Sequence, residues 1–462
     1  MPSQTVKARP KRASAEPLSS SPSAPSLVRS LGLLDASMLV VGCIVGSGIF
    51  RSASSIAAHV TSPSLTIALW IFGGLLSLCG ALCYAELAAL FPQSGGDYVY
   101  ISASYGRISG FLFGWTKLFI ERTGTIAILG KVFADYLRRA LPYPESAATA
   151  IAAAAIVLLT VVNIVGVRWG KYVQNLFTFL KIAALAAIIV TGLSTIGAGR
   201  AVAQDWSIPP LSVGTFRSLG VALVFVLWTY SGWTEAAYVA DEVKEPQRTV
   251  PRAILGGLLL TTVLYALVNI SYLTAVPVAD IAKTPQVAAS LMERAHGPAG
   301  AIFIAAMIAC SAFGALNGFI LSSSRVLYAM GKDHGLFARL GVVHPRFRTP
   351  AFALAVTGAI AILLVYTKTF DQIATYSTLV ISIFFILATF AVIRLRNQAP
   401  YAKRPYRAWG YPVTPIVFCL TMIAFTVNVT WSQPKEALFG FGLLALSLPL
   451  YAWSQRLSAK AA

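Results

Sequence analysis

The sequence predicts an all-α integral membrane protein with twelve membrane-spanning helices. Apolar residues make up 57% of the 462 residues and charged residues only 11%, whereas a soluble domain carries roughly 25% charged residues. Twelve apolar runs approach or exceed the length of about 20 residues that crosses a bilayer, and the loops between them are too short for a second domain. These runs are 32–58, 64–91, 106–138, 146–166, 171–196, 214–240, 251–275, 298–330, 350–367, 370–396, 412–431 and 435–454.

The net charge of +19 indicates an orientation in the membrane rather than a nucleic-acid partner. When the N-terminus is placed in the cytoplasm, most Lys and Arg residues fall in cytoplasmic segments, as the positive-inside rule requires. We therefore expect a multi-pass protein of the cytoplasmic (inner) membrane, embedded in the lipid bilayer, with both termini inside. Residues 1–28 form a basic segment rich in Ser and Pro that is expected to be a disordered cytoplasmic tail. Residues 456–462 form a second cytoplasmic tail.

Cysteine and histidine residues give no sign of a disulfide framework, a metal site or a cofactor. The five cysteines all lie in apolar runs: Cys43, Cys79, Cys83, Cys310 and Cys419. The four histidines are scattered in or beside loops, without metal-ligand spacing: His59, His296, His334 and His344. A membrane-embedded enzyme needs a cluster of such residues at one depth, so the sequence argues against an enzyme.

The first apolar run contains Gly46-Ser47-Gly48 near its middle, which predicts a broken helix. Glycine is costly in a helix interior and lets the backbone leave helical geometry. In a bilayer, unwound backbone is tolerated only where it is buried in protein or lines a polar cavity. A break therefore predicts a binding site near the membrane midplane, with half-helix amides directed at an anion. The alternative is that the glycines only allow close helix packing.

The sixth apolar run has a similar interruption at Ser231-Gly232. Breaks in the first and sixth spans suggest two five-helix repeats of inverted topology, at about 31–196 and 214–396. The last two helices, about 412–454, would be additions to a single transporter domain that covers 29–455.

The two breaks together offer the chemistry that binds the backbone of an α-amino acid. The amides of Ser47 and Gly48 and the Ser47 hydroxyl suit a carboxylate. Helix ends near Ile44 and Ser231 would leave free carbonyls, which suit an ammonium group.

Several other side chains in the spans are candidates for contact with a substrate. Trp228, beside the second break, would be either an aromatic gate over the ligand or an ordinary core aromatic. Ser231, Thr234 and Thr125 would face the substrate side chain, although hydroxyls in helices often bond only to the preceding turn.

Charged residues inside the spans carry the remaining functional predictions. Lys181 has no acidic residue within seven positions and lies deep in its span, so it is expected to be functional. It would act as a fixed cation where related transporters bind sodium, or lose its proton during transport. Glu121 can pair with Lys117 at i,i+4 spacing. Alternatively, Glu121 faces the pocket and attracts a cationic side chain.

Over about residues 30–450, the chain resembles the amino acid–polyamine–organocation transporter superfamily, and within it the L-type amino acid transporters and their bacterial relatives. The motifs that carry this resemblance are Gly46-Ser47-Gly48-Ile49-Phe50; Tyr84-Ala85-Glu86-Leu87 leading to Ser94-Gly95-Gly96-Asp97-Tyr98; Phe177-Thr178-Phe179-Leu180-Lys181; Ser231-Gly232-Trp233 followed by Glu242 and Val250-Pro251-Arg252-Ala253-Ile254; and Phe313-Gly314-Ala315-Leu316-Asn317-Gly318 with Ser323-Ser324-Arg325. Each motif is weak alone, but the five in order are specific for the superfamily.

The resemblance implies the leucine-transporter fold, with 5+5 inverted repeats plus two helices, and transport by alternating access. By position it implies a substrate site in which Ser47 and Gly48 hold the carboxylate and Gly46 assists the turn. The carbonyls of Ile44 and Ser231 would bind the ammonium group.

Further roles also follow from the resemblance rather than from the residues alone. Trp228 matches an aromatic gate. Lys181 matches a lysine that replaces a sodium ion, with Ser311 as a candidate partner because Ala315 stands where relatives often have serine.

Two departures from the family pattern bear on partners and substrates. The external loop at 141–145 lacks the cysteine that animal heteromeric members bond to a heavy chain, so no disulfide-linked heavy chain is expected. Ser231 stands where members that take cationic substrates can carry an acid, which favours neutral substrates.

The sequence thus predicts a secondary transporter of L-amino acids, most consistent with neutral ones, that works as a sodium-independent exchanger or a proton symporter. The alternatives are a cationic amino acid or polyamine carrier, with Glu121 setting selectivity, and a non-transporting amino-acid sensor with the same site.

Overall fold

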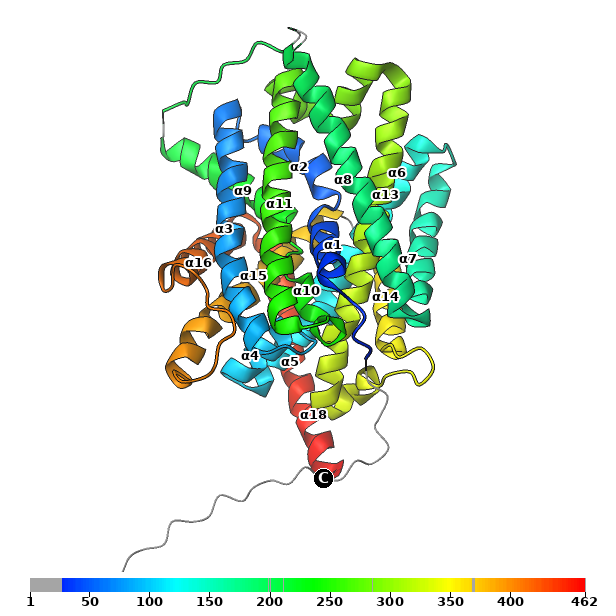
Figure 1. The fold of residues 1–462 in the computed structure, drawn as a ribbon, viewed down its shortest axis with the longest axis vertical. Coiled ribbons are helices and arrows are strands. Elements are labelled where there is room, and N and C mark those ends of the chain that lie inside the picture. The colour runs from blue at the N-terminus through cyan, green and yellow to red at the C-terminus, as the bar shows by residue number, and fades with distance from the viewer. Residues whose placement is uncertain are drawn as a thin grey trace, which may run out of the picture.

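The computed structural model is an assembly of helices that run mainly along one direction (Figure 1). It describes residues 27–461, apart from positions 198, 200, 211, 285, 368 and 369. Every named element among these residues is helical, which confirms the predicted all-α class. Nearly all of the expected N-terminal tail, residues 1–28, lies outside the described residues.

The helices have the following bounds. They are α1 (Leu33–Ile44), α2 (Gly48–Ala57), α3 (Pro63–Leu90), α4 (Asp97–Tyr105), α5 (Arg107–Thr116), the π-helical turn η1 (Lys117–Glu121), α6 (Arg122–Ala140), η2 (Glu145–Ala147), α7 (Ala148–Val165), α8 (Val167–Gly197), α9 (Val213–Tyr230), α10 (Glu235–Tyr238), η3 (Ala240–Glu242), α11 (Pro246–Ala275), α12 (Val278–Lys283), α13 (Val287–Asp333), η4 (Gly335–Gly341), α14 (Ala351–Thr367), α15 (Phe370–Gln398), α16 (Val413–Ser432), α17 (Pro434–Ala445) and α18 (Ser447–Ala461).

Ten helical segments among the described residues are long and apolar enough to cross a membrane. This finding supports the membrane class that the composition predicts. Two of the twelve expected spans fall outside that group. The run at 350–367 corresponds to α14, whose apolar part is shorter, Ala351–Tyr366. The run at 106–138 is divided among α5, η1 and α6, and it carries two buried charges near its middle, Lys117 and Arg122.

The first apolar segment is interrupted between α1 and α2. Helix α1 ends at Ile44 and α2 begins at Gly48. Between them, Val45 has φ −75° and ψ 72°, which is not helical. All three intervening residues are buried, so the interruption lies inside the protein and not against lipid.

A second interruption separates α9 from α10. Helix α9 ends at Tyr230, and the short helix α10 begins at Glu235. Gly232 has φ +107°, a backbone conformation that residues with a side chain rarely adopt. Glycine at this position therefore permits the turn that ends α9.

Helix α1 occupies the interior of the assembly. It packs against α8, α11 and α13, and α13 in turn packs against α6. Figure 1 shows α1 among these longer helices, with α16 at one flank and α7 at the other. The interruption is therefore surrounded by protein, where unwound backbone can line a binding site.

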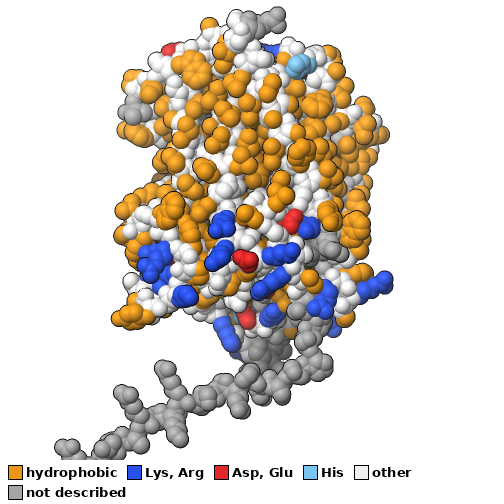
Figure 2. Space-filling model, in the orientation of Figure 1, with side chains coloured by type: hydrophobic (Ala, Val, Ile, Leu, Met, Phe, Trp, Pro, Cys, Tyr) orange, Lys and Arg blue, Asp and Glu red, His pale blue; other side chains and the backbone are white. Residues whose placement is uncertain are grey.

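Charge is concentrated at one end of the molecule. Figure 2 shows Lys and Arg side chains gathered around the end where α18 terminates, while apolar side chains cover the flanks above them. This separation of charged and apolar side chains is the one expected for a membrane protein whose charged end lies at one surface of the bilayer.

At the charged end, a buried ion pair joins α13 to the short helix η3, which follows α10. Arg325 Nη2 lies 2.9 Å from Glu242 Oε1, and both side chains are 0% exposed. Burial raises the pKa of Glu242, and the charge of Arg325 opposes that rise. The Glu242 carbonyl also accepts the amides of Ser30 and Leu31, each at 2.9 Å. These bonds fix the chain entering α1 to η3.

Candidate functional site

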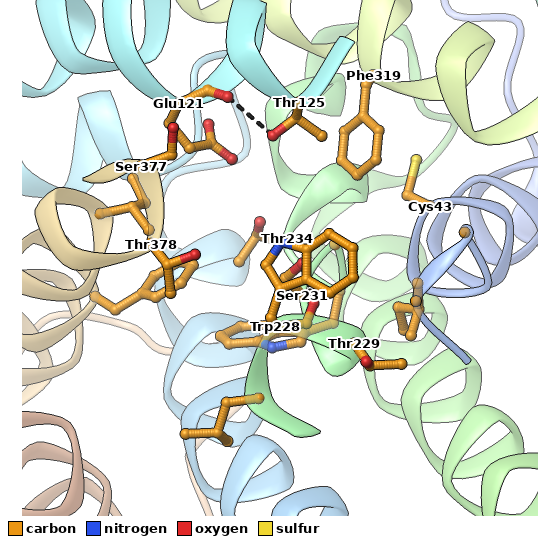
Figure 3. Close-up of a pocket in the computed structure, with 18 of the residues that line it drawn as sticks. Cys43, Glu121, Thr125, Trp228, Thr229, Ser231, Thr234, Phe319, Ser377 and Thr378 are labelled. Atoms are coloured by element: carbon orange, nitrogen blue, oxygen red, sulfur yellow. Dashed lines mark hydrogen bonds between the residues drawn. The ribbon is translucent and has the colours of Figure 1, made fainter. Parts of the chain in front are cut away.

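One cavity lies where the two interruptions meet, and it brings together nine of the ten site residues predicted from the sequence. These are Ile44, Gly46, Ser47, Gly48, Glu121, Thr125, Trp228, Ser231 and Thr234. Figure 3 shows this cavity with Glu121 and Ser377 on one side and Trp228 and Thr229 across from them. The tenth residue, Lys181, is not among the residues that line it.

Ser47 provides an unused hydrogen-bonding group at the start of α2. Its side chain is 2% exposed, and its hydroxyl has no hydrogen-bond partner among the described residues. The ten-residue helix α2 begins directly after it. The first amides of a helix lack partners within the helix and carry partial positive charge. An anion placed here would meet both the hydroxyl and these amides.

The carbonyl of Ile44 is not free, contrary to the expectation from the sequence. It accepts the Tyr265 hydroxyl and the Gly46 amide, each at 2.8 Å. Tyr265 was missed by sequence reasoning because an aromatic residue in an apolar run gives no sign of a long-range contact. By contrast, no described donor bonds to the carbonyl of Ser231.

Three predicted hydroxyls already bond within the protein. Ser231 Oγ donates to the Trp228 carbonyl at 2.7 Å, and Thr125 Oγ1 donates to the Glu121 carbonyl at 2.9 Å. Thr234 Oγ1 donates to the Tyr238 hydroxyl at 3.4 Å. Each hydroxyl oxygen still has a lone pair that can accept a hydrogen bond from a ligand.

Close backbone packing holds the two interruptions together. A Cβ atom at Gly232 would lie 2.9 Å from the carbonyl carbon of Cys43, in the last turn of α1. A Cβ atom at Gly48 would lie 3.0 Å from the Thr229 side chain. Thr229 also hydrogen-bonds to Ser52 of α2 at 2.8 Å. At Gly232 the backbone of Cys43 leaves no room for a Cβ atom, in addition to the conformational role of glycine there, whereas at Gly48 the contact with Thr229 is only tight.

Buried ion pairs line the part of the cavity formed by η1, α6 and α10. Lys117 Nζ donates to Glu121 Oε2 at 2.9 Å, which confirms the predicted i,i+4 pair. Arg122 Nη2 donates to Glu235 Oε1 at 2.9 Å. The Ser322 hydroxyl donates to the other Glu235 oxygen. The Arg122–Glu235 pair was missed, because its members are 113 positions apart.

Lys181 lies next to the first interruption but outside the cavity lining. Its side chain is 0% exposed, and Nζ donates to the Gly42 carbonyl at 2.6 Å. The expected candidate partner, Ser311, instead donates to the Val45 carbonyl at 3.2 Å. Lys181 thus bonds to the last turn of α1, whereas Ser311 bonds to the interruption that follows it.

Comparison with known proteins places the chain in a family. A family model for amino acid permeases matches residues 31–439. The serine/threonine exchanger SteT of Bacillus subtilis is 34% identical over 85% of this chain and 89% of its own length. The b(0,+)-type amino acid transporter 1 of Mus musculus is 32% identical over 94% and 91%. The large neutral amino acids transporter small subunit 2 of Homo sapiens is 31% identical over 92% and 80%.

These matches cover nearly all of the chain and confirm the resemblance to the amino acid–polyamine–organocation superfamily. The family and these relatives are transporters rather than enzymes. Together with the apolar helices, the matches show that the chain belongs to the amino acid permease family of membrane transporters.

Proposed function

We propose that the chain is a sodium-independent secondary transporter of neutral L-amino acids that works by alternating access. The observation that carries the proposal is the meeting of two interrupted helices at one cavity, beside a buried hydroxyl of Ser47 that has no described partner. Such an arrangement suits a small zwitterion, because one half-helix offers donors and the other offers acceptors.

The substrate backbone would bind between the two interruptions. Its carboxylate would accept hydrogen bonds from the Ser47 hydroxyl and the Gly48 amide, with Gly46 allowing the turn. Its ammonium group would donate to the Ser231 carbonyl. The Ile44 carbonyl would contribute less than the sequence suggested, because it already accepts two hydrogen bonds. Trp228 would cover the bound substrate, and Thr125 and Thr234 would face its side chain.

The proposed architecture is the leucine-transporter fold in a single domain, 29–455. Twelve spans would form two inverted repeats, about 31–196 and 214–396, followed by two helices within 412–454. The interruption after α1 and the one after α9 would occupy equivalent places in the two repeats. The charged end seen in Figure 2 would face the cytoplasm, with both chain termini on that side of the cytoplasmic membrane.

Lys181 would replace a coupling sodium ion. Its buried ammonium group bonds to an α1 carbonyl beside the interruption, where it supplies a fixed positive charge. Exchange and proton-coupled uptake both fit this position. SteT, described as a serine/threonine exchanger, favours exchange.

We propose that the chain works without a disulfide-linked heavy chain. One relative is named as a small subunit, which implies a partner for that protein. In this chain the five cysteines lie in α1, α3, α13 and α16, away from the external loop at 141–145.

A carrier of cationic amino acids or polyamines is the second candidate, because Glu121 lines the cavity. Lys117 and Arg122 lie 2.9 Å and 3.4 Å from one Glu121 oxygen and offset its charge, which favours neutral substrates. The variant Glu121→Gln distinguishes a carrier of cationic substrates from a carrier of neutral ones. Unchanged lysine and arginine uptake by this variant would exclude Glu121 as the determinant of cationic selectivity.

The test is uptake of a radiolabelled amino-acid panel into proteoliposomes, preloaded or empty, with and without an inward proton gradient. Uptake of neutral amino acids only into preloaded vesicles would indicate exchange. Uptake into empty vesicles driven by the gradient would indicate proton symport. Specific binding without flux under any condition would indicate a sensor and contradict the proposal.

A further inference from the structure

The cavity is lined by a charge cluster whose total charge is zero. Its charged lining residues are two cations and two anions, Lys117, Arg122, Glu121 and Glu235. Lys117 pairs with Glu121, and Arg122 pairs with Glu235, each at 2.9 Å. Asp97 lies beyond this lining, where it accepts the hydroxyls of Tyr84 and Tyr238. A ligand with a net charge on its side chain would therefore enter a cavity without a free counter-charge.

Glu121 keeps one carboxylate oxygen available to a ligand. Lys117 Nζ and Arg122 Nε approach the same oxygen, Oε2, at 2.9 Å and 3.4 Å. Within the described part of the chain, no donor bonds to Oε1. The Glu121 side chain is 16% exposed, and Figure 3 shows it across the open space from Trp228 and Ser231.

Arg122, the next residue in the chain, also lines the cavity and has one donor nitrogen without a partner among the described residues. Its side chain is 2% exposed, and Nη1 has no hydrogen-bond partner among the described residues, whereas Nε already lies 3.4 Å from Glu121 Oε2. The guanidinium carbon lies 4.7 Å from the Phe319 ring centroid and 5.6 Å from that of Tyr238. These contacts and the bond to Glu235 hold the guanidinium in place. An unsatisfied buried donor is costly, so the site gains when a ligand oxygen reaches it.

We propose that Glu121 and Arg122 form a second recognition point, which binds a hydroxyl or carboxamide group on the side chain of the substrate. This inference rests on the proposed function and specifies its substrate class. Hydroxyl and carboxamide groups both donate and accept hydrogen bonds, so each can donate to Glu121 Oε1 and accept from Arg122. An apolar side chain leaves both groups unpaired. A charged side chain leaves a net charge in the buried cavity.

The test compares amino acids of matched shape in proteoliposomes that contain the full chain. Threonine has a hydroxyl group where valine has a methyl group. Asparagine has a carboxamide group where leucine has an apolar group of similar shape. We expect threonine and asparagine to compete for uptake at least about tenfold more strongly than valine and leucine, because sites built for hydrogen bonding reject analogues that lack the group. Equal competition within each pair would overturn the inference.

A double variant then locates the preference. Lys117→Met combined with Glu121→Leu removes one ion pair as a unit and keeps the cavity's net charge at zero. The threonine-to-valine preference of the uptake that remains is expected to fall to about twofold or less. A preference equal to that of the wild type would overturn the inference. The matched control is Arg138→Gln with Glu145→Gln, which removes an exposed ion pair and is expected to keep the preference.

Failure of the proposed function and misfolding of the double variant can each be told apart from failure of this inference. If the wild-type chain transports no amino acid, the proposed function fails, irrespective of selectivity. If the double variant does not fold, Glu121→Gln replaces it, because a neutral amide accepts hydrogen bonds more weakly than a carboxylate. We expect the threonine-to-valine preference of Glu121→Gln to fall by about threefold or more. An unchanged preference would overturn the inference.

Discussion

Lys181 Nζ donates a 2.6 Å hydrogen bond to the carbonyl oxygen of Gly42, two residues before α1 ends at Ile44. The lysine lies on α8 and is fully buried, so the bond ties α8 to the last turn of α1. Hydrogen bonds to charged groups contribute about 1.5–3 kcal/mol. The position of the α1 end, and of the interruption after it, therefore depends on a cation from a distant part of the chain.

Replacing Lys181 should impair transport more than folding. Lys181→Met keeps much of the side-chain volume but removes the donor to Gly42. We expect the rate of amino-acid exchange in proteoliposomes to fall by about tenfold or more, since the lost hydrogen bond corresponds to at least about 1.5 kcal/mol. Lys171→Met is the control on the same helix, because Lys171 is 19% exposed in its pair with Asp35. Wild-type exchange by Lys181→Met would contradict the proposed role.

Gly232 should tolerate no side chain. A Cβ atom there would lie 2.9 Å from the carbonyl carbon of Cys43, and the residue has φ +107°. Backbone strain of this kind costs about 1–3 kcal/mol, and relief would require α1 and α9 to separate. Gly232→Ala is therefore expected to lower the thermal midpoint and to abolish uptake.

Gly220→Ala is the matched control for that substitution. Gly220 lies in α9, the helix that precedes Gly232, and a Cβ atom at Gly220 meets nothing within 4 Å. Alanine is also a better helix former than glycine. We expect Gly220→Ala to retain uptake and thermal midpoint, measured side by side with Gly232→Ala. Equal behaviour of the two variants would refute the close approach of the two interruptions.

Ser47 should set the affinity for the substrate carboxylate. Ser47→Ala removes a buried hydroxyl without a described partner, so the empty protein should lose little stability. The apparent KM for amino-acid uptake is expected to rise by about tenfold, because a hydrogen bond to a charged group is worth about 1.5–3 kcal/mol. Ser54→Ala, which removes an exposed hydroxyl on α2, should leave KM unchanged. An unchanged KM in Ser47→Ala would exclude Ser47 from the carboxylate site.

The features that the sequence predicted well are local ones. The Gly46-Ser47-Gly48 run and Gly232 mark the interruptions because glycine has distinctive backbone physics. Trp228 and Ser231 could be placed at the same depth because they immediately precede Gly232 along the chain. The Lys117–Glu121 pair follows from helix spacing. Each prediction needed only a few consecutive residues.

The features that were missed depend on packing between distant helices. Tyr265 bonds to the Ile44 carbonyl across 221 positions, which fills an acceptor that seemed free from helix ends alone. Arg122 meets Glu235 across 113 positions, and periodicity within either segment carries no information about the other. Lys181 was predicted to be functional, and its hydrogen-bond partner is the backbone carbonyl of Gly42, which residue identity cannot reveal.

His334 gives the protein a pH-dependent weakness at the charged end. The residue follows α13, is 1% exposed, and neither ring nitrogen has a partner among the described residues. Its ring makes edge-to-face contacts with the rings of Phe111 and of Tyr451 in α18, with centroid distances of 5.0 Å and 6.0 Å. Burial lowers the pKa of His334 below its ordinary value of 6.5, an effect that the charge of Asp333 opposes.

The unfolded chain therefore binds a proton at His334 at a higher pH than the folded chain does, and stability must fall as pH drops below 6.5. We expect the thermal midpoint in detergent to be lower at about pH 5.5 than at about pH 7.5. His334→Phe keeps an aromatic ring beside Phe111 and Tyr451 but cannot titrate, so its midpoint should change less between the two pH values. If the variant and the wild type lose the same stability on acidification, the proton is bound elsewhere. A midpoint for His334→Phe that equals the wild type at about pH 7.5 but exceeds it at about pH 5.5 would assign the loss to this ring.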